Sequence, residues 1–422
     1  MNIYNNPSLA SQYELSKRPL LSSRTLRTTV IDIFDAVQRD GDDALVMYTE
    51  KFDNATIERV NVKAQVYDVS DGVKKAINQA MNNISVFHSA QVTSSIKKVQ
   101  TTKGVTCWNE TRPIERVGIY IPGGTAPLVS TAMMLGIPAR IAGCKEIVLC
   151  TPPQANGLIP DEIGYIAALL GITEIYSIGG AQAIAAMSLG TQTIRPVDKI
   201  FGPGNQYVNA AKQYANENGV AIDMVAGPSE VMVVADEYAD PAFVAADLLS
   251  QLEHGVDSQA VLVVTARSLA AKVSEEIEAQ LQLLSRAEVI RESLQNSYAV
   301  VLSDSESCFK FVSMYAPEHL IIATESARSD ARKVTRAGSV FIGAYSPESA
   351  GDYASGTNHT LPTNGWSKST SGVSVSSFQT TIQFQELTQD GLASIAKTVN
   401  VLAGIEGLDA HASAVTIRLK KA

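Results

Sequence analysis

The sequence predicts an α/β protein that contains two parallel-sheet domains. Between residues 116 and 225, short apolar runs alternate with helical segments, and Gly or Pro marks most of the changes. A second alternation of the same kind covers residues 231–342, as an old duplication would leave it. Strands that alternate with helices through short connections are typical of a parallel sheet covered by helices. We therefore expect one such sheet in each stretch.

The first stretch has apolar runs that end at glycine-containing turns. We expect strands over 116–122, 146–150, 173–178, 199–201 and 220–225, and helices over 130–143, 161–170, 181–189 and 205–217. The turns Gly123–Gly124, Gly179–Gly180 and Gly202–Pro203–Gly204 follow three of these strands. Ligands of open α/β sheets bind outside the carboxyl ends of the strands, so the turns mark a candidate binding edge. Each turn alone has a simpler explanation, because glycine is common in any tight turn.

The second stretch has the same organisation. We expect strands over 231–235, 260–265, 298–302, 319–323 and 339–342, and helices over 240–253, 267–284 and 305–315. Residues 25–100 show helical periodicity at 29–50 and 72–90, and we expect these helices to pack on this second sheet. Residues 344–380 are rich in Ser, Thr and Gly, and a loop of that length is usually functional. Residues 385–422 are expected to form a helical tail.

Composition and charge exclude several classes of protein. The chain has 422 residues, with 34 Lys and Arg against 43 Asp and Glu, and its formal charge is −9. An acidic chain without a basic tract is a poor partner for nucleic acid. No apolar run is long enough to span a membrane, and residues 1–25 lack a secretory signal. The cysteines are too scattered for a disulfide framework or a CxxC metal site. We expect a soluble, cytoplasmic protein.

Several histidines lie beside other polar residues in the second half of the chain. Gln251 and His254 are three residues apart, on one face at a helix end. Asp352 and His359 share a polar loop, and His411 lies in the tail. Imidazole, carboxylate and amide donors without thiols suit zinc or a similar divalent ion. Spacing alone leaves an alternative open, in which these histidines are only hydrogen-bonded or solvated.

Glu318 and His319 form a candidate catalytic pair. They lie at the start of an expected strand, where neighbouring side chains can both reach one pocket. An imidazole can move the proton of a substrate hydroxyl, and a carboxylate can activate water. A surface ion pair at a strand start is the alternative, and the two residues alone do not decide between them.

These segments together resemble the histidinol dehydrogenase family, and they occur in the family's order from residue 116 to residue 419. The matching stretches are RVGIYIPGGTAPLVSTAMMLGIPARIAGCKEIVLCTPP (116–153), IGGAQAIAA (178–186), KIFGPGNQYV (199–208), AIDMVAGPSEV (221–231), DLLSQLEHGVDSQ (247–259), YAPEHLII (315–322), AGSVFIGAYSPESAGDYASGTNHTLPT (337–363) and AHASAVTIRL (410–419). The resemblance rests on the whole series, because no single motif is specific enough.

The resemblance implies two Rossmann-like parallel-sheet domains in an intertwined homodimer. It implies a short N-terminal helical arm over 1–22 and a discontinuous first α/β domain over 23–119 and 230–373. The second α/β domain, over 120–229, would form the NAD-binding side. A C-terminal helical tail over 374–422 would cross to the partner subunit and share its active site.

The resemblance also implies an activity and a set of site residues. The activity is the NAD-dependent oxidation of L-histidinol to L-histidine through histidinaldehyde, with two NAD⁺ and one zinc per site. Zinc would be bound by Gln251, His254, Asp352 and His411. Glu318 and His319 would be catalytic, and Tyr120, Gln182 and Asn205 would contact NAD. The substrate contacts would be Ser229, His319, His359, Glu406 and the four zinc ligands.

Two alternatives remain at this point. One is a relative that oxidises another small alcohol, such as a sulfopropanediol, to its acid by the same steps. His359 and Glu406 favour histidinol, because they match the residues expected to hold it. The other is a zinc-stabilised binding or scaffold protein, against which the intact Glu318–His319 pair argues.

Overall fold

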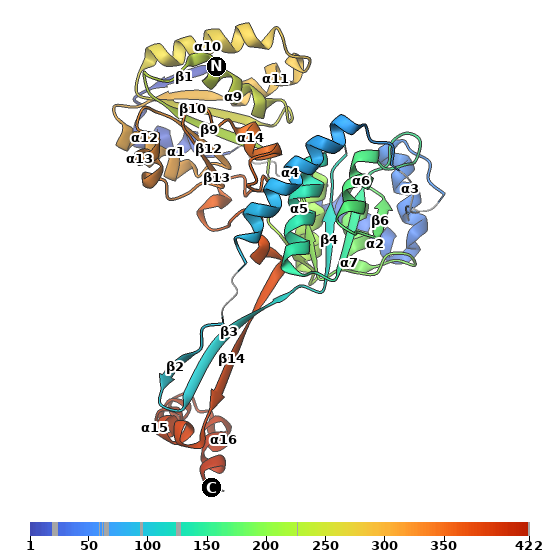
Figure 1. The fold of residues 1–422 in the computed structure, drawn as a ribbon, viewed down its shortest axis with the longest axis vertical. Helices are drawn as coiled ribbons and strands as arrows, with labels where there is room; N and C mark the ends of the chain where they lie inside the picture. The colour runs from blue at the N-terminus through green and yellow to red at the C-terminus, as the bar shows by residue number, and fades with distance from the viewer. Residues whose placement is uncertain are drawn as a thin grey trace. The chain divides into compact units, whose positions relative to one another are not determined.

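A computed structural model shows how the chain folds (Figure 1). It describes residues 1–18, 24–58, 60, 62, 67–92, 96–123, 128–225 and 227–420. The chain forms two compact units. The first unit consists of Met1–Gln91 and Glu115–Phe378, and the second consists of Val92–Ile114 and Gln379–Ala422. No helix among the described residues is both long and apolar enough to cross a membrane.

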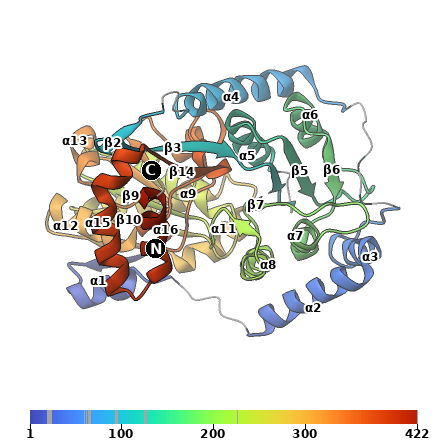
Figure 2. The same cartoon turned by 90° about the horizontal axis from the view of Figure 1, so that it is seen from below.

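A five-stranded parallel sheet forms in the first unit, as predicted. Its strands are β4 (Arg116–Tyr120), β5 (Glu146–Thr151), β6 (Glu174–Ser177), β7 (Lys199–Phe201) and β8 (Ala221–Ile222), in the order β6-β5-β4-β7-β8. The connecting helices are α5 (Val129–Ala142), α6 (Asp161–Leu169), α7 (Gly180–Leu189) and α8 (Gln206–Glu217). Figure 2 shows α5 and α6 on one face and α7 and α8 on the other. Every residue of β4 is buried, which explains its apolar run.

A six-stranded parallel sheet repeats this arrangement. Its predicted strands are β9 (Glu230–Ala235), β10 (Gln259–Val264), β11 (Tyr298–Val301), β12 (His319–Ala323) and β13 (Ser339–Ile342), in the order β11-β10-β9-β12-β13. The helices are α9 (Pro241–Leu252), α10 (Arg267–Leu281), α11 (Ala287–Ser293), α12 (Ser305–Tyr315) and α13 (Ala327–Asp330). Alternate residues of β9 face opposite layers: Val231 and Val233 pack with α9 and α10, whereas Met232 and Val234 pack with α12.

The N-terminal arm contains a strand that was not expected. Residues Asn2–Asn5 form β1, which pairs in parallel with β11 and extends the six-stranded sheet at its edge. The helix α1 (Leu9–Leu15) follows. Ile3 packs against the same apolar core as the central strands, which explains why the segment pairs with the sheet.

The expected packing of the helices from residues 25–100 was wrong. The helices α2 (Arg24–Asp40) and α3 (Asp42–Asp53) share one apolar core with α7 and α8 of the five-stranded sheet. The helix α4 (Asp71–Ser89) lies beside α5 of the same sheet. The helical period predicts which face of each helix is buried. It does not predict which of the two sheets that face packs against, because both sheets have apolar helical layers. The domain boundaries given above remain a prediction.

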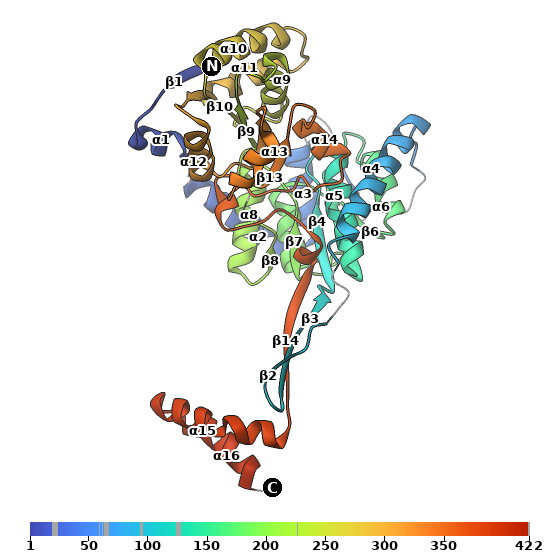
Figure 3. The same ribbon diagram turned by 60° about the vertical axis from the view of Figure 1, so that its left-hand side comes forward.

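The second unit combines a small antiparallel sheet with two helices. The strands are β2 (Val99–Thr102), β3 (Val105–Pro113) and β14 (Gln379–Leu387), in the order β14-β3-β2. β14 pairs with β3 along its whole length, from Gln379 opposite Pro113 to Leu387 opposite Val105. The helices α15 (Gln389–Ile405) and α16 (Asp409–Lys420) then form a hairpin (Figure 3), as predicted for the tail. The three strands were not predicted.

A buried ion pair fixes the turn after β7. Lys212 Nζ lies 2.5 Å from Asp223 Oδ1, and both side chains are 1% exposed. Lys212 also donates to the carbonyl of Gly202 at 2.8 Å, and the Gly202 N–H donates to Asp223 Oδ2 at 2.8 Å. The pair therefore holds Gly202 from both sides, just before the first turn of α8.

Lys212→Met should destabilise the first unit by about 3–5 kcal/mol, because it leaves the Asp223 charge buried without its partner. Urea unfolding followed by circular dichroism measures the loss. Arg27→Met is the control, because the Arg27–Glu217 pair is exposed and should contribute only about 0–1 kcal/mol. A loss for Lys212→Met no larger than that of the control would contradict this account.

Candidate active site

The candidate catalytic pair lies at the amino end of β12, between β9 and the edge strand β13 of the six-stranded sheet. His319 is the first residue of the strand, and it stands opposite Val231 of β9 and Ser339 of β13. Glu318 immediately precedes it. Both side chains are almost completely buried. The pair is therefore held between two neighbouring strands and is not a surface ion pair, which removes that alternative.

The backbone of Glu230, at the start of β9, contacts both members of the pair. Its N–H donates to Glu318 Oε2 at 2.9 Å, and its carbonyl oxygen lies 3.3 Å from His319 Nδ1. Nδ1 also lies 3.3 Å from Glu348 Oε1. Because these neighbours of Nδ1 are acceptors, the proton of the neutral ring belongs on Nδ1. Nε2 has no hydrogen-bond partner among the described residues, although Asp352 Oδ1 lies 3.7 Å away, and in the neutral ring it is the nitrogen that can act as a base.

Acidic side chains gather around this imidazole. Glu348 and Asp352 lie on α14 (Glu348–Tyr353), and ligand atoms of His319, Glu348 and Asp352 all lie within 4.8 Å of one another. Burial lowers the pKa of His319, but the charges of Glu348, Glu318 and Asp352 outweigh it and raise the pKa to about 10. Burial also raises the pKa of Glu348 well above its usual value. Such a concentration of negative charge fits a bound cation.

One of the expected zinc ligands, Gln251, contacts this cluster. Gln251 is buried on the last turn of α9. Its side-chain amide is assigned the orientation in which the oxygen faces a donor and the nitrogen faces acceptors, and the nitrogen then donates to the Glu348 carboxylate. In that orientation its Oε1 accepts the Glu230 N–H at 3.1 Å. His254 follows the helix and is exposed. Nitrogen and oxygen donors of this kind suit zinc.

His359 and Ser229 lie at the same end of the sheet. His359 is half-buried, and its Nε2 has no hydrogen-bond partner among the described residues. Burial lowers the pKa of His359, and nearby Asp352 opposes that effect. Ser229 directly precedes β9 and is also half-buried. The unpaired imidazole nitrogens of His319 and His359 are therefore available to a polar ligand.

The expected NAD residues lie at the carboxyl edge of the five-stranded sheet. The Tyr120 hydroxyl, at the end of β4, accepts the Gly180 N–H at 3.0 Å. Gln182 is fully buried on α7, yet neither its Oε1 nor its Nε2 has a partner among the described residues. Asn205 begins α8, and its Oδ1 accepts from the N–H groups of Tyr207 and Val208. These residues flank the point where the strand order reverses, between β4 and β7.

Two positions at this edge require glycine, because neighbouring atoms leave no room for a Cβ. A Cβ on Gly202, where φ is +132°, would lie 2.2 Å from the Tyr120 carbonyl oxygen. A Cβ on Gly179 would lie 2.5 Å from Pro152. Gly124 of the first expected turn lies outside the described residues. The two unpaired atoms of Gln182 also lie at this edge, and NAD binding there remains a prediction.

Two expected site residues belong to the second unit. Glu406 caps the carboxyl end of α15, and His411 lies in the first turn of α16. Both are exposed. Their roles as substrate and zinc contacts remain predictions.

Sequence reasoning missed two residues of the site. Glu348 lies four residues before Asp352, so one helical turn places both carboxylates on the same face, and this spacing could have revealed it. Glu230 acts mainly through its backbone, for which the sequence carries no signal.

Comparisons with known proteins give relatives over almost the whole length of the chain. A family model described as histidinol dehydrogenase matches residues 16–419. The histidinol dehydrogenase of Bacteroides thetaiotaomicron is 51% identical, over 99% of each chain. That of Escherichia coli K12 is 47% identical, over 99% of this chain and 96% of the relative. A crystal structure of histidinol dehydrogenase from Elizabethkingia anophelis superposes with a TM-score of 0.97 at 50% identity, covering 100% of this chain and 98% of that one.

If Asp352 binds zinc, Asp352→Asn should weaken Zn²⁺ binding by at least the roughly 10–100-fold that is typical when only a supporting residue is lost, because the change would remove a charged oxygen ligand. Competition with a chromogenic chelator measures the affinity. Asp330→Asn is the matched control, since Asp330 is a buried carboxylate held by Thr324, Ser326 and Lys333. The control should bind Zn²⁺ as the unchanged chain does. Equal affinity in the Asp352 variant would contradict a metal centre at this position.

Proposed function

The chain belongs to the histidinol dehydrogenase family, and we propose that it converts L-histidinol to L-histidine through histidinaldehyde, using two NAD⁺ per substrate. It is an NAD-dependent oxidoreductase that acts on an alcohol and an aldehyde. The reaction would supply the last two steps of histidine biosynthesis. The observation that carries the proposal is the buried Glu318–His319 pair beside the acidic cluster of Glu348 and Asp352.

The substrate would be held at the amino ends of β9 and β12. Gln251, His254 and Asp352 would hold zinc together with His411, and Ser229, His359 and Glu406 would contact the substrate. When bound, the zinc ion supplies a Lewis acid that orients the amine and imidazole nitrogens of histidinol. The unpaired Nε2 of His359 and the buried carboxylates support this assignment.

His319 would act as the base in both oxidations. Its Nδ1 faces acceptors, so Nε2 is the atom free to take the hydroxyl proton of histidinol. Removal of that proton lets the carbinol carbon release a hydride. Tyr120, Gln182 and Asn205 would hold NAD, which accepts the hydride in each step.

Glu318 would activate the water that converts the aldehyde into a gem-diol. Its Oε2 is already fixed by the Glu230 N–H, which leaves Oε1 to accept a proton from water. The water oxygen bonds to the aldehyde carbon, and the gem-diol then loses its proton to His319 and its hydride to the second NAD⁺. The balanced reaction consumes histidinol, water and two NAD⁺, and it gives the histidine carboxylate, two NADH and three protons.

The substrate itself can be tested with one absorbance assay. NADH formation should be rapid with L-histidinol and far slower with other amino alcohols and with diols such as sulfopropanediol. A strong preference for one of those compounds would overturn histidinol as the substrate while leaving the two-step chemistry in place.

We also propose that the active chain is a cytoplasmic homodimer with shared sites. Val401, Leu402 and Ile405 of α15 are at least half exposed in the single chain, and such an apolar patch is typical of an interaction surface. The exposed Glu406 and His411 lie beside this patch in the sequence. The cysteines are all free, as is common in the cytoplasm.

Glu318→Gln should slow the aldehyde step by about 10²–10⁴-fold, because the amide cannot accept a proton from water. The alcohol step should change much less. Supplying histidinaldehyde directly and following NADH separates the two steps. Glu325→Gln is the matched control, since Glu325 is exposed near the opposite end of β12 and should leave both steps unchanged. Aldehyde oxidation at the unchanged rate in the Glu318 variant would refute its role.

Mixing of two inactive variants tests the shared site. In a mixed dimer of Glu318→Gln and His411→Asn, one site collects both changes and the other site is intact if His411 acts in the partner's site. Random mixing of equal amounts should then restore about a quarter of the normal activity, from the two-fold symmetry. Each variant alone, refolded in the same way, is the control. No recovery from proven mixed dimers would place His411 in its own chain's site.

A further inference from the structure

We propose that Arg18 is a positioning residue for the catalytic pair. Its guanidinium contacts the turn that leads into Glu318 and His319, and it also contacts Glu230, whose backbone holds both of them. The inference rests on the proposed function and adds a residue that touches neither substrate nor cofactor. Arg18 lies in the segment after α1, more than two hundred residues from the site in the sequence.

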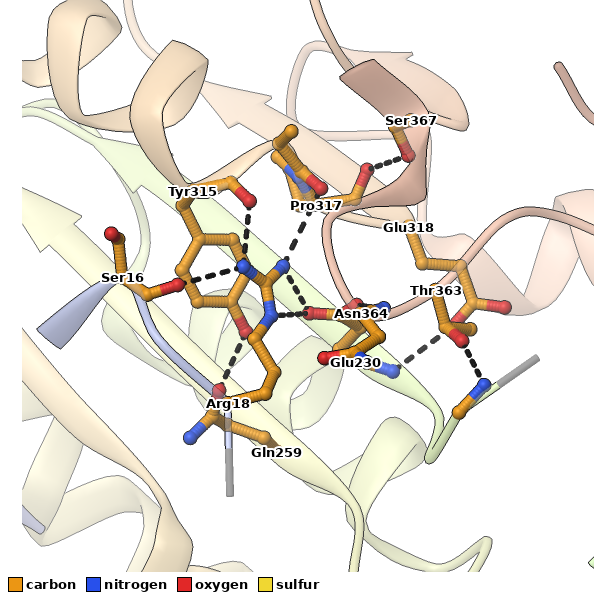
Figure 4. A network of polar contacts seen from close by, with 12 residues as sticks. Ser16, Arg18, Glu230, Gln259, Tyr315, Pro317, Glu318, Thr363, Asn364 and Ser367 are labelled. Carbon is orange, nitrogen blue, oxygen red and sulfur yellow. Dashed lines mark hydrogen bonds and ion pairs between the residues drawn. The ribbon is translucent and has the colours of Figure 1, made fainter. Parts of the chain in front are cut away.

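The guanidinium uses its donors in several directions at once (Figure 4). Nε and Nη2 donate to Glu230 Oε2 at 2.8 and 2.5 Å. Nη1 donates to the carbonyls of Ser16 at 2.9 Å and Tyr315 at 2.6 Å, and Nη2 lies 3.4 Å from the Ala316 carbonyl oxygen. The guanidinium carbon also lies 3.4 Å from the centre of the Tyr315 ring. Both charged side chains of the Arg18–Glu230 pair are less than 10% exposed.

The contacts with Tyr315 and Ala316 order the turn that presents the pair. Ala316 has φ of +54°, a left-handed conformation that a residue with a Cβ rarely adopts. Pro317 and Glu318 follow directly, so a change at Ala316 would redirect the Glu318 side chain. Arg18 binds the carbonyls on both sides of this residue and thereby holds the turn in its strained form.

The contact with Glu230 orders the other half of the arrangement. The Glu230 backbone binds Glu318 through its N–H and His319 through its carbonyl. Its carboxylate is fixed at both oxygens, by Arg18 at Oε2 and by the Asn364 N–H at Oε1. Glu230 therefore cannot move without moving both catalytic side chains, and Arg18 is the charge that keeps its carboxylate buried.

Only an arginine can make these contacts together. A planar fork of five N–H donors reaches a carboxylate and several carbonyls in fixed directions, whereas an ammonium is a compact point charge. Arg18→Lys therefore keeps the charge beside Glu230 and removes the geometry. The substitution separates a role in positioning from a role in neutralising the buried carboxylate.

Arg18→Lys should lower kcat by about 10²-fold, which is the loss expected when catalytic groups are misplaced by about 1 Å. The KM for histidinol and the zinc content should change much less than kcat, because Arg18 touches none of the groups that hold substrate and zinc, and of the proposed zinc ligands only Gln251 contacts Glu230. Arg116→Lys is the matched control. Arg116 is equally buried and forms paired contacts with Glu174 at 2.7 and 2.6 Å in the other sheet. It should lower the melting temperature and leave kcat unchanged.

Crystal structures of the unchanged chain and of Arg18→Lys give a readout that does not depend on turnover. The Glu230–Glu318 hydrogen bond should lengthen or break in the variant, with the rest of the sheet unchanged. Normal kcat in a folded Arg18→Lys, or an unmoved Glu318 in its structure, would overturn the inference. If histidinol is not the substrate, the unchanged chain will not oxidise it either, and kcat cannot test Arg18. The position of Glu318 in the two crystal structures then decides whether Arg18 is a positioning residue.

A second variant covers the case in which Arg18→Lys does not fold. Arg18→Gln combined with Glu230→Gln replaces the ion pair by two amides that can bond to each other, so no charge is buried without a partner. This double variant should fold and show the same loss of kcat. Full kcat in the double variant would refute a positioning role for Arg18.

Discussion

Two contacts with the backbone of Glu230 hold the proposed catalytic pair in place. The N–H of this residue holds one oxygen of Glu318, and its carbonyl faces the protonated nitrogen of His319. The first contact leaves the other carboxylate oxygen for water, and the second leaves Nε2 for the substrate proton. Both depend on the register in which β12 lies beside β9, so the sheet itself sets the geometry of the reaction. The proposed catalytic groups lie at the amino ends of these strands, whereas the residues expected to hold NAD lie at the carboxyl ends of the strands in the other sheet.

Electrostatics explains why the same site suits a metal. Glu318, Glu348 and Asp352 surround one imidazole in a space that is largely closed to water. Carboxylates in such surroundings are costly unless a cation or hydrogen bonds compensate them. The amide of Gln251 donates a hydrogen bond to the Glu348 carboxylate, and His319 lies near all three carboxylates. A zinc ion with nitrogen and oxygen ligands would complete the compensation and bring the two nitrogens of the substrate to the base.

The central strands and the longer helices of both sheets could be predicted from the sequence, because buried parallel strands are continuous apolar runs and Gly or Pro ends them. The edge strand β1 was missed. The strands of the second unit could not be predicted, because most of β14 is exposed, β3 is only partly buried, and both carry polar residues, as in QTTIQFQEL. The helical period of α2 identified its buried face. It did not identify the sheet whose helices pack against that face. The resemblance supplied the expected site residues, but the link from Arg18 to Glu230 joins residues far apart in the chain, and only the folded structure shows it.

We propose that one site performs two successive oxidations with a water addition between them. The direct measurement is the amount of NADH formed from a limiting, known amount of L-histidinol, with the product identified by chromatography. The account predicts two NADH per histidinol, with L-histidine as the product and no free aldehyde. One NADH per histidinol, with the aldehyde released, would contradict it.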